Sequence, residues 1–304
     1  MQKIILIAGP TGSGKSEIAL RLAKKINGEI INADSMQVYK EIKILSARPE
    51  SYFNISHYLY GNISVKSNFS AGEWLKKVKL NLKKIINKKK QPIFVGGTGL
   101  YFKLLIEGIS NIPKIPDLIR TKARNLNAKL GNNKFYSLLM KLDPLVQNKI
   151  KENDTHRLIR AYEVMIYTKK SLIDWQKKNK NYFSNYRFVK IYINPGNNFL
   201  KKLLRLRLKK MFEIGAVDEV KKFLKLKINS YLPANKILGI EEIKKYLDKK
   251  ILLEQAFEET FIRTRRYVKR QRTWYRGHMK DWTSIFNPNF DILTKKILNL
   301  VTSS

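Results

Sequence analysis

Eight residues near the N-terminus have the composition and spacing of a phosphate-binding loop. The stretch Gly9-Pro10-Thr11-Gly12-Ser13-Gly14-Lys15-Ser16 matches the pattern G-x-x-x-x-G-K-[ST] in full. In such a loop successive backbone N–H groups turn inward, the start of the following helix adds positive potential, and the lysine adds a charge. The serine hydroxyl is a ligand for Mg²⁺. The stretch therefore predicts a site for two adjacent phosphates, with Ser16 as the metal ligand.

A carboxylate and a hydroxyl follow the next two predicted strands. Asp34 comes directly after the apolar segment 29–33, and Thr98 follows segment 92–95 through two glycines. Because ligands bind beyond the carboxyl ends of parallel strands, both side chains are expected near the phosphate loop. A nucleotide hydrolase would also place an acid for the metal at such a strand end, and none follows residues 92–95. The diphosphate therefore need not be ATP, although Asp34 and Thr98 could also be plain helix caps.

A strongly basic segment near the C-terminus predicts contact with nucleic acid. No acidic residue lies between Glu259 and Asp281. Cations and aromatic rings alternate there: Phe261, Arg263, Arg265, Arg266, Tyr267, Lys269, Arg270, Arg272, Trp274, Tyr275, Arg276 and Lys280. Such side chains contact phosphates and stack on bases. A basic helix lying on a membrane is the alternative, and polar interruptions at Gln271 and Thr273 favour RNA.

The composition supports the same view. The chain has 304 residues, with 61 Lys and Arg against 24 Asp and Glu, which leaves a formal charge of +37. A polyanionic partner would compensate such a charge, although AT-rich codons explain part of the lysine excess. A hydrophobic content of 43% is enough for a sizeable core and excludes disorder as the dominant state.

Several classes of site are excluded or not expected. The sequence has no cysteine, which excludes disulfides, thiolate metal sites and a cysteine nucleophile. Its three histidines, His57, His156 and His278, show no metal-ligand spacing. No apolar run reaches the roughly 18 residues of a membrane span, and the N-terminus does not resemble a signal peptide. We therefore expect no membrane association and a cytoplasmic protein.

Strands and helices alternate through the first third of the chain. Predicted strands cover 4–8, 29–33 and 92–95, and predicted helices cover 15–26, 71–87 and 99–107. Ser70 and Glu73 form a capping box, and Trp74, Val78 and Ile85 form a buried stripe. This order predicts an α/β fold, with a P-loop NTPase-like parallel sheet flanked by helices.

The rest of the chain predicts an insertion into this fold. Residues 116–185 have an entirely helical pattern, a strand-like segment follows at 188–193, and segments 200–226 and 239–277 are helical and basic. We expect a first part of the core at 1–115, an all-helical insertion domain at 116–186, and a core continuation with a basic helical part at 187–304.

Five motifs together resemble the tRNA dimethylallyltransferase family, also called the IPP transferase family, in its bacterial form. They are the phosphate loop, Asp34-Ser35-Met36-Gln37-Val38-Tyr39, Val95-Gly96-Gly97-Thr98-Gly99-Leu100-Tyr101, His156-Arg157-Leu158-Ile159-Arg160-Ala161-Tyr162-Glu163-Val164, and Lys269-Arg270-Gln271-Arg272-Thr273-Trp274-Tyr275-Arg276. They occur in the family's order and span almost the whole chain. The resemblance implies transfer of a dimethylallyl group from dimethylallyl diphosphate to the N6 amine of adenosine 37, next to the tRNA anticodon.

The resemblance also implies roles for single residues. Asp34 matches the general base, which takes the proton of the weakly nucleophilic amine. Lys15, Thr98, Mg²⁺, Arg120 and Arg207 would stabilise charge on the departing diphosphate. Arg120 could instead be a solvent-facing helix residue, and Thr98 a cap of the helix 99–107. The family often has another arginine four residues before Arg207, where this chain has Leu203, and Arg205 would face another side of the helix.

For the tRNA anticodon arm, the resemblance implies contacts from four regions. They comprise Asp34 with Ser35, Met36 and Gln37; His156, Arg157, Leu158, Ile159 and Arg160; Lys236 and Gly239; and residues Lys269 to Arg276. The helical insertion would clamp the arm. We expect a monomer without a stable protein partner.

Two other functions remain open on the sequence alone. The same loop could belong to an ATP-dependent kinase or an RNA-stimulated ATPase, which would release phosphate from ATP. The chain could also be a non-enzymatic RNA-binding module whose loop senses a nucleotide. The identity of the tRNAs and the preference among allylic donors are not encoded in these patterns.

Overall fold

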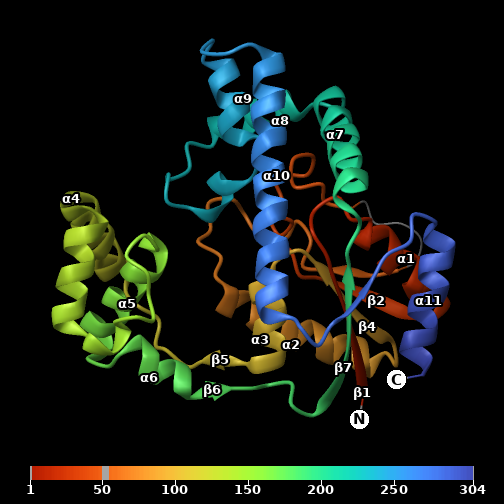
Figure 1. The fold of residues 1–304 in the computed structure, drawn as a ribbon, viewed down its shortest axis with the longest axis horizontal. Helices are drawn as coiled ribbons and strands as arrows, with labels where there is room; N and C mark the ends of the chain where they lie inside the picture. The colour runs from red at the N-terminus through yellow and green to blue at the C-terminus, as the bar shows by residue number, and fades with distance from the viewer. Residues whose placement is uncertain (1, 50–54, 304) are drawn as a thin grey trace. The chain divides into compact units, whose positions relative to one another are not determined.

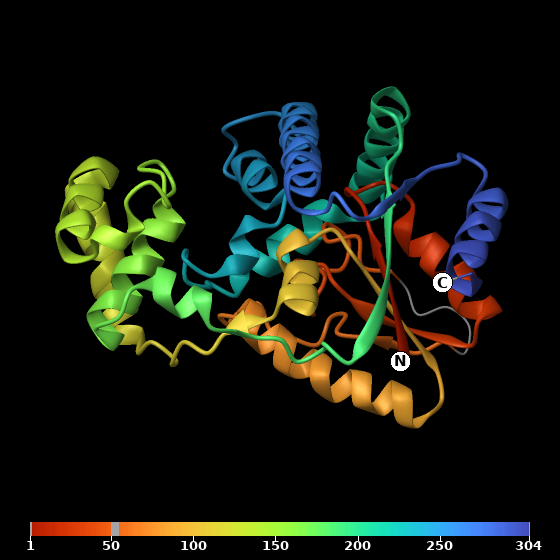
Figure 2. The same cartoon turned by 60° about the horizontal axis from the view of Figure 1, so that its bottom comes forward.

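The computed structural model describes residues 2–49 and 55–303. Internal contacts divide the chain into two compact units (Figures 1 and 2). Unit 1 consists of Met1–Ile106 and Ser184–Ser304, and unit 2 is Glu107–Phe183. The second unit is therefore inserted, along the sequence, between two parts of the first.

A six-stranded sheet forms the centre of unit 1. Its strands are β1 (Gln2–Ala8), β2 (Gly28–Asn32), β3 (His57–Tyr58), β4 (Gln91–Gly96), β7 (Tyr186–Ile193) and β8 (Thr283–Ile285). They pair in the order β3-β2-β4-β1-β7-β8, and every pair is parallel. The expected α/β fold with a parallel sheet is confirmed. The edge strands β3 and β8 were not expected, because two or three residues are too few to show a periodic pattern.

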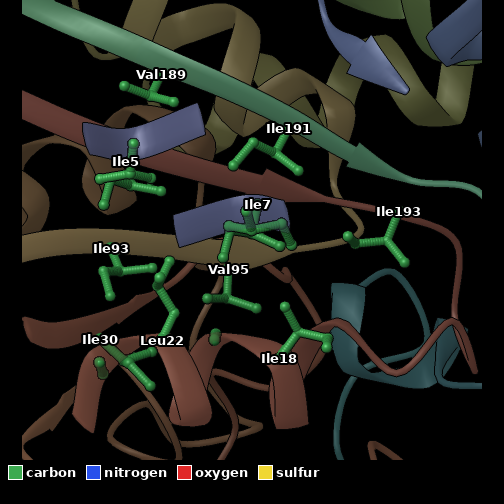
Figure 3. Close-up of a cluster of buried hydrophobic side chains, with 14 of the residues drawn as sticks. Ile5, Ile7, Ile18, Leu22, Ile30, Ile93, Val95, Val189, Ile191 and Ile193 are labelled. Carbon is green, nitrogen blue, oxygen red and sulfur yellow. The ribbon is translucent and has the colours of Figure 1, made fainter. Parts of the chain in front are cut away.

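Helices α1 (Lys15–Lys25) and α11 (Phe290–Thr302) cover one face of this sheet. Ile18 and Leu22 of α1 point toward the isoleucines and valines of the strands (Figure 3). Leu293 and Ile297 of α11 are fully buried in the same cluster. Each such side chain stabilises the fold by about 1.5–3 kcal/mol through burial. The cluster fixes the start of α1, and with it the phosphate loop.

The opposite face is covered by α2 (Ala71–Asn87) and α3 (Gly99–Glu107). The Ser70 capping box is present as expected, and Trp74 is fully buried. Its ring stacks on Tyr101 of α3, with ring centroids 4.0 Å apart, and its Nε1–H donates to the Asn32 carbonyl at 2.9 Å. Trp74 thus ties both helices to the end of β2.

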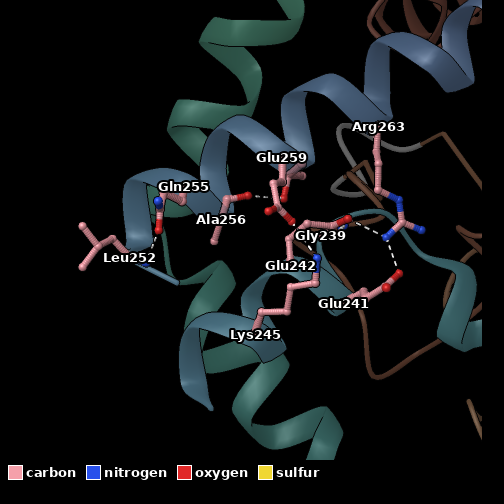
Figure 4. A network of polar contacts seen from close by, with 10 residues as sticks. Gly239, Glu241, Glu242, Lys245, Leu252, Gln255, Ala256, Glu259 and Arg263 are labelled. Carbon is pink, nitrogen blue, oxygen red and sulfur yellow. Dashed lines mark hydrogen bonds and ion pairs between the residues drawn. The ribbon is translucent and has the colours of Figure 1, made fainter. Parts of the chain in front are cut away.

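Four helices and a 3₁₀ turn form the remainder of unit 1. They are α7 (Asn197–Glu213), α8 (Ala216–Lys225), η2 (Pro233–Lys236), α9 (Ile240–Leu247) and α10 (Leu253–His278). Leucines of α7 pack against Phe261 and Val268 of α10. Arg263 of α10 pairs with Glu241 at 2.6 Å and with Glu242, and Lys245 pairs with Glu259 at 2.9 Å (Figure 4). Packing and ion pairs therefore both hold α10 in place.

Unit 2 is mainly helical. It contains α4 (Asp117–Leu142), η1 (Pro144–Val146), α5 (Thr155–Thr168) and α6 (Leu172–Lys177) around a core that includes Phe135, Leu139 and Leu158. A two-residue ladder joins β5 (Ile109–Ser110) to β6 (Asn179–Lys180). The expectation that residues 116–185 are entirely helical is therefore wrong at β6, which is too short to show alternation.

Candidate active site

The phosphate loop connects β1 to α1 as its sequence predicts. Gly14 precedes the first helical residue with φ = 83°, a left-handed conformation that glycine adopts without strain. Lys15 is buried, and its Nζ donates to the carbonyl of Pro10 at 3.3 Å, so the side chain folds back over the loop. Ser13 is also buried, and its hydroxyl has no hydrogen-bond partner. Both side chains therefore lie within the loop.

The electrostatics of Lys15 connect the loop with two further charged residues. Burial lowers the pKa of Lys15 to about 8, the carboxylate of Asp34 opposes this shift, and the guanidinium of Arg207 adds to it. Burial likewise lowers the pKa of Arg207, again against the field of Asp34. Lys15 thus lies within the fields of Asp34 and Arg207, with Lys15 buried and the other two residues half-buried.

Asp34 lies in a tight turn just beyond β2. The Asp34 N–H donates to the side-chain oxygen of Asn32 at 2.8 Å, and the Asn32 amide donates to the Asp34 carbonyl at 2.9 Å. Oδ1 of Asp34 accepts the N–H of Met36 at 3.0 Å. No helix begins within the described residues that follow, up to 49, so the alternative of Asp34 as a helix cap is wrong.

Thr98 lies next to this turn. Its hydroxyl oxygen accepts the N–H of Ser35 at 2.9 Å, and its own N–H donates to the Ala33 carbonyl at 3.1 Å. The hydroxyl also donates to the Ser35 hydroxyl at 3.2 Å. These partners lie on the Asp34 turn, so the Thr98 side chain serves that turn, and the helix-cap alternative has no support in these bonds.

The strand order brings the three features together. β1 is paired with β4, and β4 with β2, so the phosphate loop, the Thr98 turn and the Asp34 turn leave adjacent strand ends. Gly97 lies among them: a Cβ added there would be 3.4 Å from Oδ2 of Asp34 and 3.4 Å from the Gly9 carbonyl. The carboxylate therefore stands within a few ångströms of the backbone that carries the phosphate loop.

The arginines expected near the diphosphate divide between the two units. Arg207 lies on α7 in unit 1 and shares the site of Lys15 and Asp34. Arg205 instead pairs with Glu258 of α10 and stacks on Phe257 and Phe261, which agrees with its different helix face. Arg120 lies on α4 in unit 2, where its Nε is 3.8 Å from the buried carboxylate of Glu163.

The expected RNA segment on α10 is not uniformly exposed. Lys269, Arg270, Thr273 and Arg276 are exposed, as contacts with RNA require. Gln271 and Tyr275 are buried, at 6% and 2% exposure. Arg272 donates to the side chain of Asn197 and the carbonyl of Pro195.

Trp274, on the same turn of α10, lies against Gly99 and stacks on His278 with ring centroids 4.4 Å apart. Half of this segment thus contacts the protein itself.

The other expected RNA residues are similarly divided. Gln37 is buried, and its amide donates to the carbonyls of Ser46 and Ala47, while Met36 packs on a neighbouring apolar cluster. Gly239 is buried at the start of α9, and Lys236 is exposed on η2.

In α5 of unit 2, His156 and Arg157 are exposed, Leu158 is buried, and Ile159 and Arg160 are half-buried. Arg160 pairs with Glu163 at 3.4 Å. Of this motif, His156 and Arg157 are therefore the side chains most open to a partner.

Two residues that support the site were not identified from sequence. Asn32 is fully buried and orients the Asp34 turn. Glu219 of α8 accepts the backbone N–H groups of Lys43, Ile44 and Leu45 at 2.6–2.9 Å. Asn32 could have been identified from the sequence, because it is an asparagine at the end of an apolar strand. Glu219 gave no such sequence signal, because an acid in the first turn of a helix is ordinary.

The Mg²⁺ ion expected from the sequence would have one protein ligand, Ser16. Ser16 borders a cavity of about 80 Å³ together with Glu17, His57 and Tyr60. Within residues 2–49 and 55–303, no three acidic, histidine or cysteine side chains cluster as a metal cage. A single hydroxyl beside a phosphate loop fits Mg²⁺, which keeps waters and takes its other ligands from substrate phosphates.

None of the helices in the described part of the chain combines the length and the apolar character that a membrane span requires.

Comparison with known proteins identifies the family. The IPP transferase family model matches residues 37–278. A tRNA dimethylallyltransferase of Pelagibacter ubique is 49% identical over 300 residues, covering 97% of this chain and 95% of that protein. The corresponding protein of Rickettsia canadensis is 42% identical over 297 residues, covering 97% and 91%.

Solved structures agree. The tRNA isopentenylpyrophosphate transferase of Staphylococcus epidermidis aligns over 100% of both chains, with a TM-score of 0.70 and 28% identity. A eukaryotic dimethylallyltransferase, described in crystallographic snapshots of its action on tRNA, covers 94% of this chain with 74% of its own, with a TM-score of 0.77 and 27% identity. The resemblance inferred from the motifs is therefore confirmed, and this chain belongs to the IPP transferase family of tRNA dimethylallyltransferases.

Proposed function

We propose that the chain transfers a dimethylallyl group from dimethylallyl diphosphate to the N6 amine of adenosine 37 in tRNA and releases diphosphate. The observation that carries this proposal is the position of Asp34. Its carboxylate lies beside Gly97, on the turn that Thr98 holds through Ser35, and within the fields of Lys15 and Arg207 of the diphosphate site. A base next to a diphosphate cradle is what alkylation of an amine requires.

In this mechanism the C–N bond forms as the bond between the allylic carbon and the diphosphate oxygen breaks. Asp34 accepts the proton that the amine loses. Lys15 and Arg207 compensate the charge that grows on the departing diphosphate, and we assign Arg120 to the same task. Bound at Ser16, Mg²⁺ would add further positive charge at the phosphates. Thr98 holds the turn that carries the base.

For the tRNA, we propose contacts from the exposed cations of α10, Lys269, Arg270 and Arg276, and from His156 and Arg157 of α5. Exposed arginines and lysines bind phosphates, and an anticodon loop presents unstacked bases at low cost. We propose that the chain works alone, in the cytoplasm, where its RNA substrate occurs.

The test is transfer of a labelled donor. Purified protein, Mg²⁺ and labelled dimethylallyl diphosphate are incubated with an unmodified anticodon stem-loop that carries adenosine at position 37. Label is expected on that adenosine, and a matched stem-loop with guanosine there should remain unlabelled. Transfer to neither RNA would overturn the proposal, whereas phosphate release from ATP would indicate a kinase or ATPase.

A further inference from the structure

Gln271 connects the RNA-binding helix with the phosphate loop. Its Oε1 accepts the N–H of Thr11 at 3.0 Å, and its Nε2 donates to the carbonyl of Gly97 at 2.8 Å. The side chain is only 6% exposed. One amide group therefore joins the loop after β1 to the loop after β4, from a third element, α10.

The Gln271 amide packs so closely on Gly97 that residue 97 has no room for a side chain. A Cβ at Gly97 would collide with the Gln271 amide, and this same position lies 3.4 Å from Oδ2 of Asp34. The amide thus occupies the space directly beside the base and the loop. Both its oxygen and its nitrogen are engaged by protein backbone.

The neighbouring residue holds a second wall of the site. Arg272 donates to Pro195 and Asn197, where α7 begins. α7 supplies Arg207, and its Leu204 lies against Gly12 of the loop. Two consecutive residues of α10 therefore brace the two elements that face the diphosphate, while Lys269 and Arg270, one half-turn earlier, remain exposed.

We propose that Gln271 is a positioning residue for the donor, which holds the phosphate loop in its binding shape, and that it is not a contact to tRNA. The inference rests on the proposed function, because it assumes that this loop takes a diphosphate. Without the amide, the Thr11 N–H and the Gly97 carbonyl lose their partners, and the loop is free to close onto itself.

Two binding measurements separate this role from an RNA contact. Affinity for inorganic pyrophosphate with Mg²⁺ is measured by calorimetry, and affinity for a fluorescent anticodon stem-loop by anisotropy. Gln271→Met keeps a side chain of similar size without either hydrogen bond. We expect it to weaken pyrophosphate binding about tenfold and to leave RNA affinity within about twofold. The exposed Lys269→Ala should weaken RNA binding and spare pyrophosphate.

Steady-state kinetics give an independent readout. For Gln271→Met, the KM for dimethylallyl diphosphate should rise by about the same factor, with a smaller change in kcat at saturating donor. Loss of RNA affinity with unchanged pyrophosphate binding would overturn the inference, as would unchanged binding of both. If the wild-type protein fails to bind pyrophosphate, the diphosphate site itself is refuted and the inference with it.

Discussion

The hydroxyl of Thr98 accepts the backbone N–H of Ser35 at 2.9 Å. This bond joins the end of β4 to the turn that carries Asp34, the proposed base, across the two neighbouring strands β2 and β4. Since the Asn32 side chain holds the same turn from the β2 side, Asp34 is fixed from both directions. The turn that carries the carboxylate is therefore held at the carboxyl ends of both β2 and β4.

Thr98→Val keeps the shape of the side chain and removes the oxygen. The Ser35 N–H, in a half-buried site, then lacks its acceptor, at a cost of about 1–3 kcal/mol. We expect the transfer rate to fall by up to about tenfold, with little change in donor affinity. Thr98→Ser, which keeps the hydroxyl, is the matched control and should restore most of the rate. Equal rates for the valine and serine variants would contradict the role of this bond.

Asp34→Asn distinguishes the proposed role of Asp34 as a base from its role in the turn. The asparagine side chain still offers an oxygen to the Met36 N–H, which Oδ1 accepts at 3.0 Å, so the turn should persist. The variant cannot take a proton, and we expect the single-turnover rate to fall by about 10²–10⁴ while donor binding stays close to that of the wild type. Rapid-quench measurements with saturating RNA and donor provide the rate. A near-normal rate in Asp34→Asn would exclude the base role.

The lowered pKa of Lys15 predicts that affinity for the donor depends on pH. Burial lowers its pKa to about 8, so above that pH the amine is increasingly neutral. A bound diphosphate favours the ammonium form, which raises the pKa again and requires uptake of a proton. Affinity should be constant below the lowered pKa and fall as the pH rises through it, by at most about tenfold per unit.

Calorimetry with dimethylallyl diphosphate, in two buffers of different ionisation enthalpy, measures the proton uptake directly. Lys15→Arg is the control, because its guanidinium stays charged throughout this range. If wild type and Lys15→Arg lose affinity in parallel, Lys15 is not the group that titrates.

Much of the fold could be predicted because it depends on local patterns. Strand–loop–helix alternation, the Ser70 capping box and the phosphate loop are each encoded within a few residues. The edge strands β3 and β8 and the β5–β6 ladder could not be predicted, because their pairing depends on partners far away in sequence. The boundary at Gly215, with φ = 108°, divides a basic segment that appears continuous by composition.

The placement of Lys15, Ser16 and Asp34 beyond strand ends could be predicted, because the loop motif and the apolar strands are encoded locally. The division of the α10 motif into buried and exposed residues could not be predicted. Gln271 and Arg272 stand between exposed cations in the sequence, and only the packing of α10 against the sheet turns them inward. Amide and guanidinium groups suit RNA and protein backbone equally well, so composition could not distinguish their roles.

Glu219 supports the Asp34 region from a distance. Its carboxylate accepts three consecutive backbone N–H groups, of Lys43, Ile44 and Leu45, and is 9% exposed. The same loop continues to Ser46 and Ala47, whose carbonyls hold the Gln37 side chain, three residues after the base. Removing the carboxylate should therefore loosen both the fold and the turn.

Glu219→Ala leaves these donors without an acceptor, and we expect the free energy of unfolding to fall by about 2–4 kcal/mol in urea titrations. Glu219→Gln keeps one acceptor oxygen, so its free energy of unfolding should fall by less. Asp218→Asn is the matched control: Asp218 is exposed and pairs with Lys221 at 3.4 Å, so its change should stay below about 1 kcal/mol. Equal unfolding midpoints for Glu219→Ala and Asp218→Asn would show that the carboxylate does not hold this loop. A slower transfer rate in Glu219→Ala, measured well below its unfolding transition, would place the loop in the support of Asp34.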